Sequence, residues 1–293
     1  MSAVNVISEP RARVGIAIAL AAAAGFALAN TSASVAYQGG SNPLTVAATR
    51  FLVPTAALIV WLRVSGLSLA LPRRDAWAAI LLGVVTAFYT WALLRSFSSI
   101  PFALAVLIFY LFPLMAAVMV AGLGWERFSW KTGAAIVLAL AGLALALDVR
   151  GGNLNTEGVT LAFLAAAGLA VVVAVSSRVF GKGDARPLTL YMAATASVVL
   201  FILCAVSGDF ALPHTASGWI GFAAAAAFYG FAMIAFFIAI TMIGPVRASL
   251  LSYADAVISA GLGVVVLGQA LTLVQIAGIA LVIVALIGAT QPR

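Results

Sequence analysis

Ten long apolar segments run through this sequence and constrain its fold more than any other feature. A helix that crosses the hydrocarbon layer of a membrane needs about 20 mostly apolar residues. Polar stretches rich in Gly and Pro separate the segments, as loops between such helices would. We therefore predict an all-α integral membrane protein with ten transmembrane helices. The predicted spans are 14–37, 44–64, 76–97, 101–121, 131–149, 157–180, 188–207, 217–240, 245–268 and 271–290.

Composition supports the same fold class and narrows the possible partners. Hydrophobic residues make up 65% of the 293 residues and charged ones 8%, whereas a soluble domain carries about 25% charged residues. The net charge is +7, but the basic residues are scattered singly, so we expect no nucleic-acid partner. One cysteine, Cys204, and one histidine, His214, exclude an intrachain disulfide and a His/Cys metal cluster. We expect no metal and no cofactor.

Lys and Arg residues predict the orientation in the membrane, because they accumulate in cytoplasmic loops. With a cytoplasmic N-terminus, twelve of them fall on that side and two, Arg95 and Arg150, on the other, while Arg50 lies inside the second span. The first span follows Arg11 and Arg13 but is too long for a signal peptide, so we expect it to remain. We predict a plasma-membrane protein, such as one of the bacterial inner membrane, with both termini cytoplasmic.

The second half of the chain repeats short motifs of the first half in the same order. Each half contains five predicted spans, and because five is odd, the second half must enter the membrane from the opposite side. We therefore predict two inverted repeats, residues 1–149 and 150–293, an arrangement typical of secondary transporters with a midplane site. The matched motifs are PLTV (43–46) with PLTL (187–190), AFY (87–89) with AFY (227–229), LPR (71–73) with LPH (212–214), Tyr110 with Tyr253, and Glu126 with Gln269.

These motifs make the chain similar to the EamA-type members of the drug/metabolite transporter superfamily over nearly its whole length. YLFP (110–113) and YADA (253–256) resemble the family's tyrosine and Pro-containing turn in spans four and nine, and Arg50-Phe51 resembles an arginine-aromatic pair in span two. Asp255-Ala256 stands where family members often have Glu-Pro. The family's Gly-Glu ending of these spans is Trp125-Glu126 and Gly268-Gln269 here.

The resemblance implies two five-helix repeats in a basket-like bundle, and a transporter of small molecules. The aromatic-rich spans three, four and eight look most like those of exporters of aromatic amino acids and related metabolites. Drug, nucleotide-sugar or other metabolite transporters of the same fold are the alternatives.

Asp255 is a charged residue near the middle of the ninth span, and Tyr110 lies at a similar depth in the fourth. An ionised carboxylate that faced lipid there would cost about 2.5–3.5 kcal/mol, so we expect Asp255 to face the bundle interior. It either binds a substrate ammonium or carries a proton, or it is a buried carboxyl that hydrogen-bonds for packing. Tyr253 is a further binding candidate, and Arg50 is positioned to offset the charge of Asp255.

Aromatic residues of spans three and eight form a second candidate surface. Phe88, Trp91 and Arg95 share one face of a helix. These residues either stack on a flat apolar substrate or pack against neighbouring helices and lipid, with Arg95 as a further charge candidate. The aromatic binding candidates are Phe88, Tyr89, Trp91, Phe228 and Tyr229.

Pro and Gly residues mark the candidate hinges. Pro113 removes one backbone hydrogen bond and so kinks the fourth span. The ninth span begins with Gly244-Pro245 and contains Gly261 and Gly263 past its middle. Each position is either a moving hinge or a static kink.

The sequence favours a secondary transporter that works by alternating access on a small-molecule substrate, and a monomer is sufficient for this. It is not expected to be an enzyme, because an intramembrane enzyme needs convergent catalytic groups and only one deep carboxylate is present. A channel or scaffold is the other alternative, but the rings of polar residues that line a pore are missing. No phosphate-binding loop of an ATPase occurs in the sequence.

Overall fold

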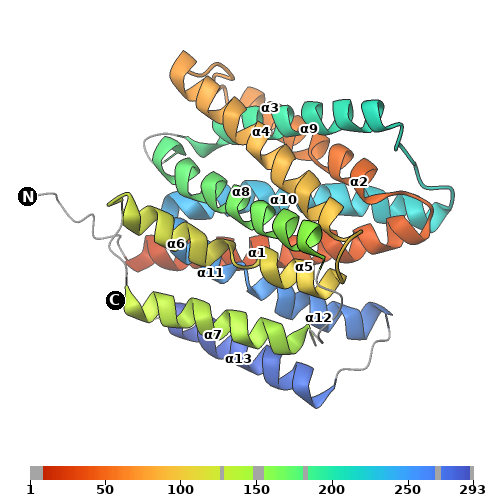
Figure 1. Cartoon of the computed structure of the whole chain (residues 1–293). Helices are drawn as coiled ribbons and strands as arrows, with labels where there is room; N and C mark the ends of the chain where they lie inside the picture. The colour runs from red at the N-terminus through yellow and green to blue at the C-terminus, as the bar shows by residue number, and fades with distance from the viewer. Residues whose placement is uncertain (1–8, 126–128, 148–154, 181–183, 268–271, 291–293) are drawn as a thin grey trace, which may run out of the picture.

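The computed structural model describes residues 9–125, 129–147, 155–180, 184–267 and 272–290, and every regular element among them is an α-helix (Figure 1). This all-α architecture is the one expected where no water can pair with backbone groups, because a helix satisfies them internally. The helices are α1 (Glu9–Gln38), α2 (Pro43–Arg50), α3 (Leu52–Val64), α4 (Arg73–Ser96), α5 (Phe102–Phe109), α6 (Phe112–Gly122), α7 (Trp130–Ala146), α8 (Thr156–Phe180), α9 (Ala185–Ser207), α10 (Ala216–Ile243), α11 (Pro245–Leu251), α12 (Ala254–Leu267) and α13 (Leu273–Thr290).

Among the described residues, five helices (α1, α4, α8, α9 and α10) and two helix pairs (α2 with α3, and α5 with α6) are long and apolar enough to cross a membrane. Shorter apolar helices are α7 and α13, and α11 with α12 covers the ninth predicted span. The protein is therefore a multi-pass membrane protein, while the tally of ten crossings stays a prediction. Among the described residues, seven candidate spans are Ala12–Gln38, Pro43–Val64, Arg73–Ser96, Phe102–Gly122, Thr156–Val179, Ala185–Ser207 and Ala216–Ile243.

Three predicted spans are interrupted inside the bundle. The breaks lie at Phe51 between α2 and α3, at Tyr110–Leu111 between α5 and α6, and at Ser252–Tyr253 between α11 and α12. Pro54 and Pro113 follow the first two breaks, and each lacks the N–H that a continuous helix would use. The third break has no proline. Its backbone hydrogen bonds span three residues instead of the four of an α-helix, as between the Asp255 N–H and the Ser252 carbonyl at 3.0 Å.

Many helix pairs connect the two halves of the chain, and among them are α1 with α10, α4 with α8 and α9, and α7 with α13. The last pair runs along one flank of the bundle (Figure 1). In the first pair, a Cβ at Gly25 would lie 3.0 Å from the Ala232 Cβ. In the second, a Cβ at Gly168 would lie 2.8 Å from the Tyr89 Cβ. Glycine thus permits close approach of both pairs.

Glycines near the starts of α1 and α8 make a second pair of matching contacts. Gly15 of α1 faces Ile243, and Gly158 of α8 faces Ile100. Gly15 and Gly158 are 143 residues apart, as are Gly25 and Gly168, and the same shift separates Tyr110 from Tyr253. One displacement along the sequence therefore relates the contacts of α1 to those of α8.

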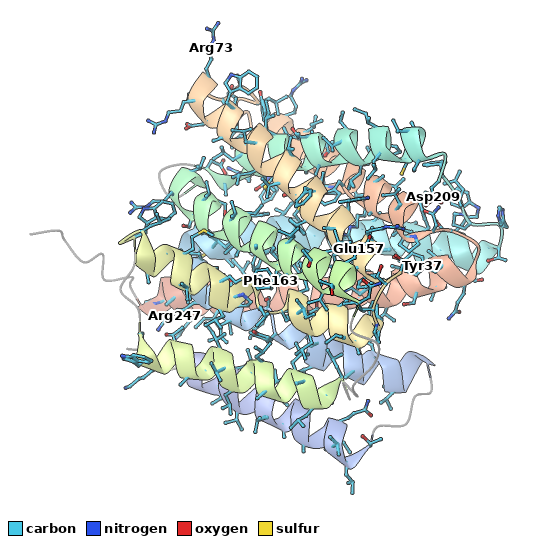
Figure 2. All side chains as sticks on the ribbon, viewed as in Figure 1. Tyr37, Arg73, Glu157, Phe163, Asp209 and Arg247 are labelled. Atoms are coloured by element: carbon cyan, nitrogen blue, oxygen red, sulfur yellow. The ribbon has the colours of Figure 1, made fainter. Side chains whose placement is uncertain are left out.

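Charged and polar side chains mark the two ends of the bundle. Arg73 and Arg247 lie toward one end, and Tyr37, Glu157 and Asp209 lie toward the other (Figure 2). At the second end, the loops before α2 and before α10 are tied together. The Asn42 amide donates to the Asp209 carboxylate at 2.7 Å, and other bonds join Ser41 to Ala211 and His214 to Gly39.

We expect Gly278→Val to separate α7 from α13 and to lower the thermal unfolding midpoint. A Cβ at Gly278 would lie 2.5 Å from the Gly142 carbonyl oxygen and would also meet the Ala146 backbone nitrogen. Overpacking of this kind costs about 1–3 kcal/mol. The matched control is Gly288→Val on the same helix, where a Cβ meets nothing within 4 Å. Equal midpoints of the two variants in detergent would contradict the close packing.

Candidate functional site

The Tyr110 hydroxyl and the Asp255 carboxylate form a buried hydrogen bond between the two broken spans. The hydroxyl donates to Asp255 Oδ2 at 2.8 Å, and the two side chains are 9% and 8% exposed. Tyr110 lies in the break between α5 and α6, while Asp255 is the second residue of α12. This contact therefore joins the first half of the chain to the second at the depth where both helices are interrupted.

Tyr253 makes the reciprocal contact from the break between α11 and α12. Its hydroxyl, which is fully buried, donates to the Tyr110 carbonyl oxygen at 2.7 Å. The two tyrosine rings stack with centroids 5.4 Å apart and an angle of 28° between their planes. The backbone here is already irregular, because Pro113 lacks the N–H that would bond the Phe109 carbonyl in a continuous helix, and the neighbouring Tyr110 carbonyl accepts the Tyr253 hydroxyl instead. The interruption of one span is thus satisfied by a side chain of the other.

Ser259 completes the surroundings of Asp255. Its hydroxyl donates to Asp255 Oδ1 at 3.1 Å, so both carboxylate oxygens accept a hydrogen bond. Sequence reasoning missed this residue, although a serine four positions after an aspartate lies on the same helix face and was a usable signal. We refer to Tyr110, Tyr253, Asp255 and Ser259 as the carboxylate cluster.

Arg50 lies in a separate group of residues and forms no ion pair with Asp255 among the described residues. The guanidinium carbon lies 4.0 Å from the centre of the Tyr229 ring and 5.6 Å from that of Phe51. Tyr89 lies close enough to interact electrostatically with both Arg50 and Tyr229. We refer to Arg50, Phe51, Tyr89 and Tyr229 as the arginine cluster.

Aromatic contacts connect the two clusters. The Tyr89 ring lies 6.2 Å from the Phe109 ring, which in turn lies 6.2 Å from the Tyr110 ring. On the other side of the arginine cluster, Phe26 of α1 packs edge-on against Tyr229 at 5.6 Å. Helices α4 and α5 therefore supply the aromatic rings between the cation and the carboxylate, and α10 and α1 extend the series on the other side of the cation.

The structure does not bring the remaining aromatic and charged candidates into these clusters. Phe88 and Phe228 are 44% and 37% exposed. Trp91 is half-buried and lies 6.1 Å from the Phe88 ring, and Arg95 is exposed near the end of α4. Their exposure fits contact with lipid.

The hinge candidates lie at or near the helix breaks, with two exceptions. Pro113 is the second residue of α6, and Pro245 is the first residue of α11. Gly244 joins α10 to α11 with φ of 83°, a left-handed conformation that favours glycine. Gly261 and Gly263 lie within α12, and the ninth predicted span is interrupted earlier, at Ser252–Tyr253. The repeat partners Glu126 and Gln269 lie outside the described residues.

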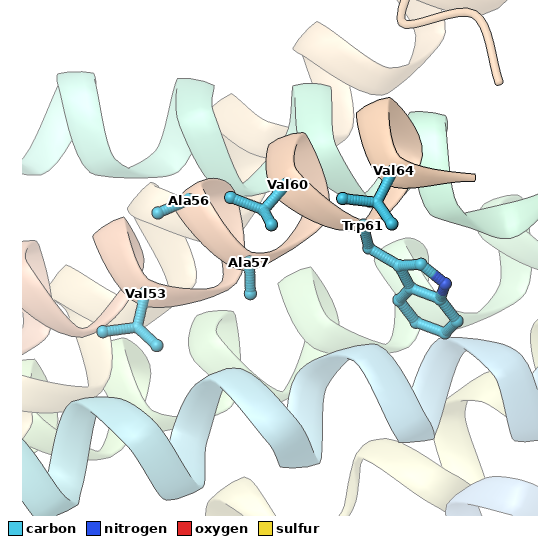
Figure 3. A pocket seen from close by; sticks show the side chains of 6 residues that line it. All are labelled: Val53, Ala56, Ala57, Val60, Trp61 and Val64. Carbon is cyan, nitrogen blue, oxygen red and sulfur yellow. The ribbon is translucent and has the colours of Figure 1, made fainter. Parts of the chain in front are cut away.

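A groove of about 600 Å³ lies along α3, and none of its lining residues belongs to either cluster (Figure 3). Its lining is apolar, which suits lipid chains better than a polar substrate. The lining residues are Val53, Ala56, Ala57, Val60, Trp61 and Val64.

Helices of this length and composition, with buried polar clusters between them, define a multi-pass membrane protein. The sequence matches the EamA-like transporter family over residues 13–147 and again over 156–291, and the chain belongs to this family. It is thus a membrane transporter of the drug/metabolite transporter superfamily. Each half of the chain carries one copy of the matched family sequence.

A comparison with solved structures gives the same fold. One of them, titled "Crystal structure of protein", superposes with a TM-score of 0.81 at 24% sequence identity, over 94% of this chain and 98% of that chain. Comparison with curated proteins gives no match.

We expect Tyr253→Phe to destabilise the protein by about 1–3 kcal/mol, because it leaves the buried Tyr110 carbonyl without a donor. The matched control is Tyr191→Phe on α9, a half-buried tyrosine whose hydroxyl has no hydrogen bond among the described residues. Thermal unfolding of both variants in detergent measures the difference. Equal midpoints would show that the contact does not hold the broken spans together.

Proposed function

We propose that the protein is a secondary transporter that works by alternating access between two inverted five-helix repeats, residues 1–149 and 150–293. The hydrogen bonds between Tyr110, Tyr253 and Asp255 are the observation that carries this proposal. They join the two halves at two breaks that occupy equivalent positions, near the middle of the bundle. Secondary transporters with inverted repeats bind substrate at such breaks.

Helix direction and packing support the inverted repeats. Tyr37 near the end of α1 and Glu157 near the start of α8 lie toward the same end of the bundle, so these helices run in opposite directions (Figure 2). The pair α1 and α10 and the pair α4 and α8 also make equivalent glycine contacts. A two-fold axis in the membrane plane accounts for both observations.

The hydrogen bonds of the carboxylate cluster hold the halves together in one of the two states. Each net bond contributes about 0.5–1.5 kcal/mol, or more where a charged group takes part. Conformations that differ by a few kcal/mol exchange readily. Rocking of one repeat against the other therefore requires that these contacts part and that the glycine-packed pairs, which also join the two halves, slide against each other.

The substrates that we propose are small metabolites, and aromatic amino acids or related compounds in particular. The tyrosines of both clusters support this, since their rings pack against flat apolar groups and their hydroxyls bind polar ones. One chain contains both clusters, so a monomer is sufficient. We propose that the protein lies in the plasma membrane with both termini in the cytoplasm. The position of Arg73 and Arg247 at one end of the bundle supports this orientation, because basic residues accumulate on the cytoplasmic side (Figure 2).

A counterflow assay in proteoliposomes tests this function. Vesicles preloaded with unlabelled compound should accumulate the labelled compound when it is an aromatic amino acid, because an alternating-access carrier exchanges substrate in both directions. Aliphatic amino acids, nucleotide-sugars and cationic drugs complete the panel. Accumulation in protein-free vesicles is the control, and exchange of none of these compounds would contradict the proposal.

We also propose that Asp255 couples transport to protons, and we expect Asp255→Asn to abolish acceleration by a pH gradient. Protonation of Asp255 would remove its charge and so weaken the hydrogen bond from the Tyr110 hydroxyl, and the amide of Asn cannot change its charge in this way. Uptake into proteoliposomes with and without an imposed gradient measures the effect. The matched control is Glu157→Gln, an exposed carboxylate at the start of α8. The same gradient response in Asp255→Asn and in the wild type would remove Asp255 as the proton carrier.

A further inference from the structure

We propose that Arg50 binds the carboxylate of the transported substrate, so that the substrates are small organic monocarboxylates with an apolar or aromatic part. This inference rests on the proposed transport function and names the chemistry of its substrate. It starts from the hydrogen-bonding state of Arg50, which is the last residue of α2.

The donors of the Arg50 guanidinium are unused. An arginine carries five N–H donors and no acceptor. Hydrogen bonds among the described residues include none from Arg50, and its buried Nε has no partner. The buried Thr90 hydroxyl, next to Tyr89 on α4, also has no hydrogen bond of good geometry within the described part of the chain, although it lies near enough to Tyr89 to interact with it. Helix α2 contacts α4, so two unsatisfied polar groups occur on neighbouring helices.

The positive charge of Arg50 is also uncompensated among the described residues. Arg50 lies at the end of the eight-residue helix α2, about 10 Å along the span from its start. Charges at such depth normally pair with one another or with backbone carbonyls. Asp255 is engaged by Tyr110 and Ser259, Asp209 by Asn42, and Asp184 by Arg186. The arginine cluster thus offers the cation but holds no anion.

The groups around Arg50 suit an organic anion. Tyr229 and Phe51 place their rings against the guanidinium, which holds it by cation–π attraction and leaves its edge available to a ligand. The guanidinium edge matches the two oxygens of a carboxylate. The half-buried Tyr89, beside Phe109, offers an aromatic surface for the rest of the substrate.

The scaffold itself does not require a cation at this position. The match of PLTV (43–46) with PLTL (187–190), a shift of 144 residues, places Ala194 of α9 opposite Arg50. Ala194 is half-buried and apolar, so the equivalent site of the second half packs without a charge. A cation at this position is therefore specific to the first half, as expected for a residue that binds substrate.

Charge balance favours a carboxylate over a phosphate. One guanidinium neutralises one carboxylate, whereas a phosphate monoester carries close to two negative charges at neutral pH. A second negative charge would stay unpaired in a site of low dielectric constant. The described part of the arginine cluster contains no second cation to accept it.

Calorimetric titration of the detergent-purified protein tests the site with matched probes. The acids are L-phenylalanine and 3-phenylpropionate, and their neutral partners are L-phenylalaninamide and 3-phenylpropionamide. At least one acid should bind tenfold or more tightly than its amide, because the loss of a charge-assisted hydrogen bond costs about 1.5–3 kcal/mol. Binding of neither acid, or equal binding of acid and amide, would overturn the proposal. Tighter binding of phenyl phosphate than of both acids would overturn the carboxylate assignment.

Variants locate the binding in Arg50. Arg50→Gln should weaken the acid about tenfold or more and leave the amide unchanged, and Arg50→Lys should fall between it and the wild type. The matched control is Arg63→Gln, an exposed arginine at the end of α3, which should bind like the wild type. Unchanged binding of the acid by a monodisperse Arg50→Lys and Arg50→Gln would overturn the proposal.

The same proteoliposome counterflow assay separates this inference from the proposed function. Acid binding that depends on Arg50, without counterflow of that acid, would contradict transport and leave the anion site standing. Counterflow of acid and amide at equal rates in wild type and Arg50→Gln would support transport and overturn the anion site.

Discussion

Unpaired polar groups inside an apolar bundle are the constraint on which this structure depends. A helix break frees a backbone carbonyl, and inside a membrane no water is present to donate a hydrogen bond to it. Another part of the protein must therefore supply the donor. Here the Tyr253 hydroxyl supplies it to the Tyr110 carbonyl, and the Tyr110 hydroxyl in turn satisfies Asp255. Each broken span is thus completed only by the other, which ties the two halves of the chain together at their weakest points.

The two halves share a scaffold but differ in their charged residues. Equivalent glycines and tyrosines recur in both halves. Asp255, in contrast, corresponds by the same shift to the buried Phe112, and Arg50 corresponds to the half-buried Ala194 by the match of PLTV with PLTL. Packing explains the residues that recur. The two charges occur once each, where packing alone would be served by an apolar side chain, and we therefore relate them to function.

The separation of the two charges has a consequence for the site. A cation and a carboxylate in direct contact would neutralise each other and leave little for a ligand. In this structure hydroxyl groups satisfy the carboxylate and aromatic rings hold the cation, with Tyr89 and Phe109 between them. A zwitterionic amino acid carries an ammonium group and a carboxylate. An anion and a cation that are held apart, as Asp255 and Arg50 are, suit the amino-acid substrates that we propose.

The sequence by itself determined the all-helical membrane fold, because long apolar runs have few other ways to satisfy their backbone. It also indicated where polar residues would matter: Tyr110 and Tyr253 stand in matched motifs, and the cost of a carboxylate in lipid argued for the burial of Asp255. Only the tertiary structure decided the partners. Helix periodicity places a residue on a face, but which helix covers that face depends on contacts between segments far apart in the chain. For this reason the pairing of Asp255 with Tyr110 rather than with Arg50, the outward position of Phe88 and Phe228, and the break at Ser252–Tyr253 instead of at Gly261 emerged only once the helices were packed.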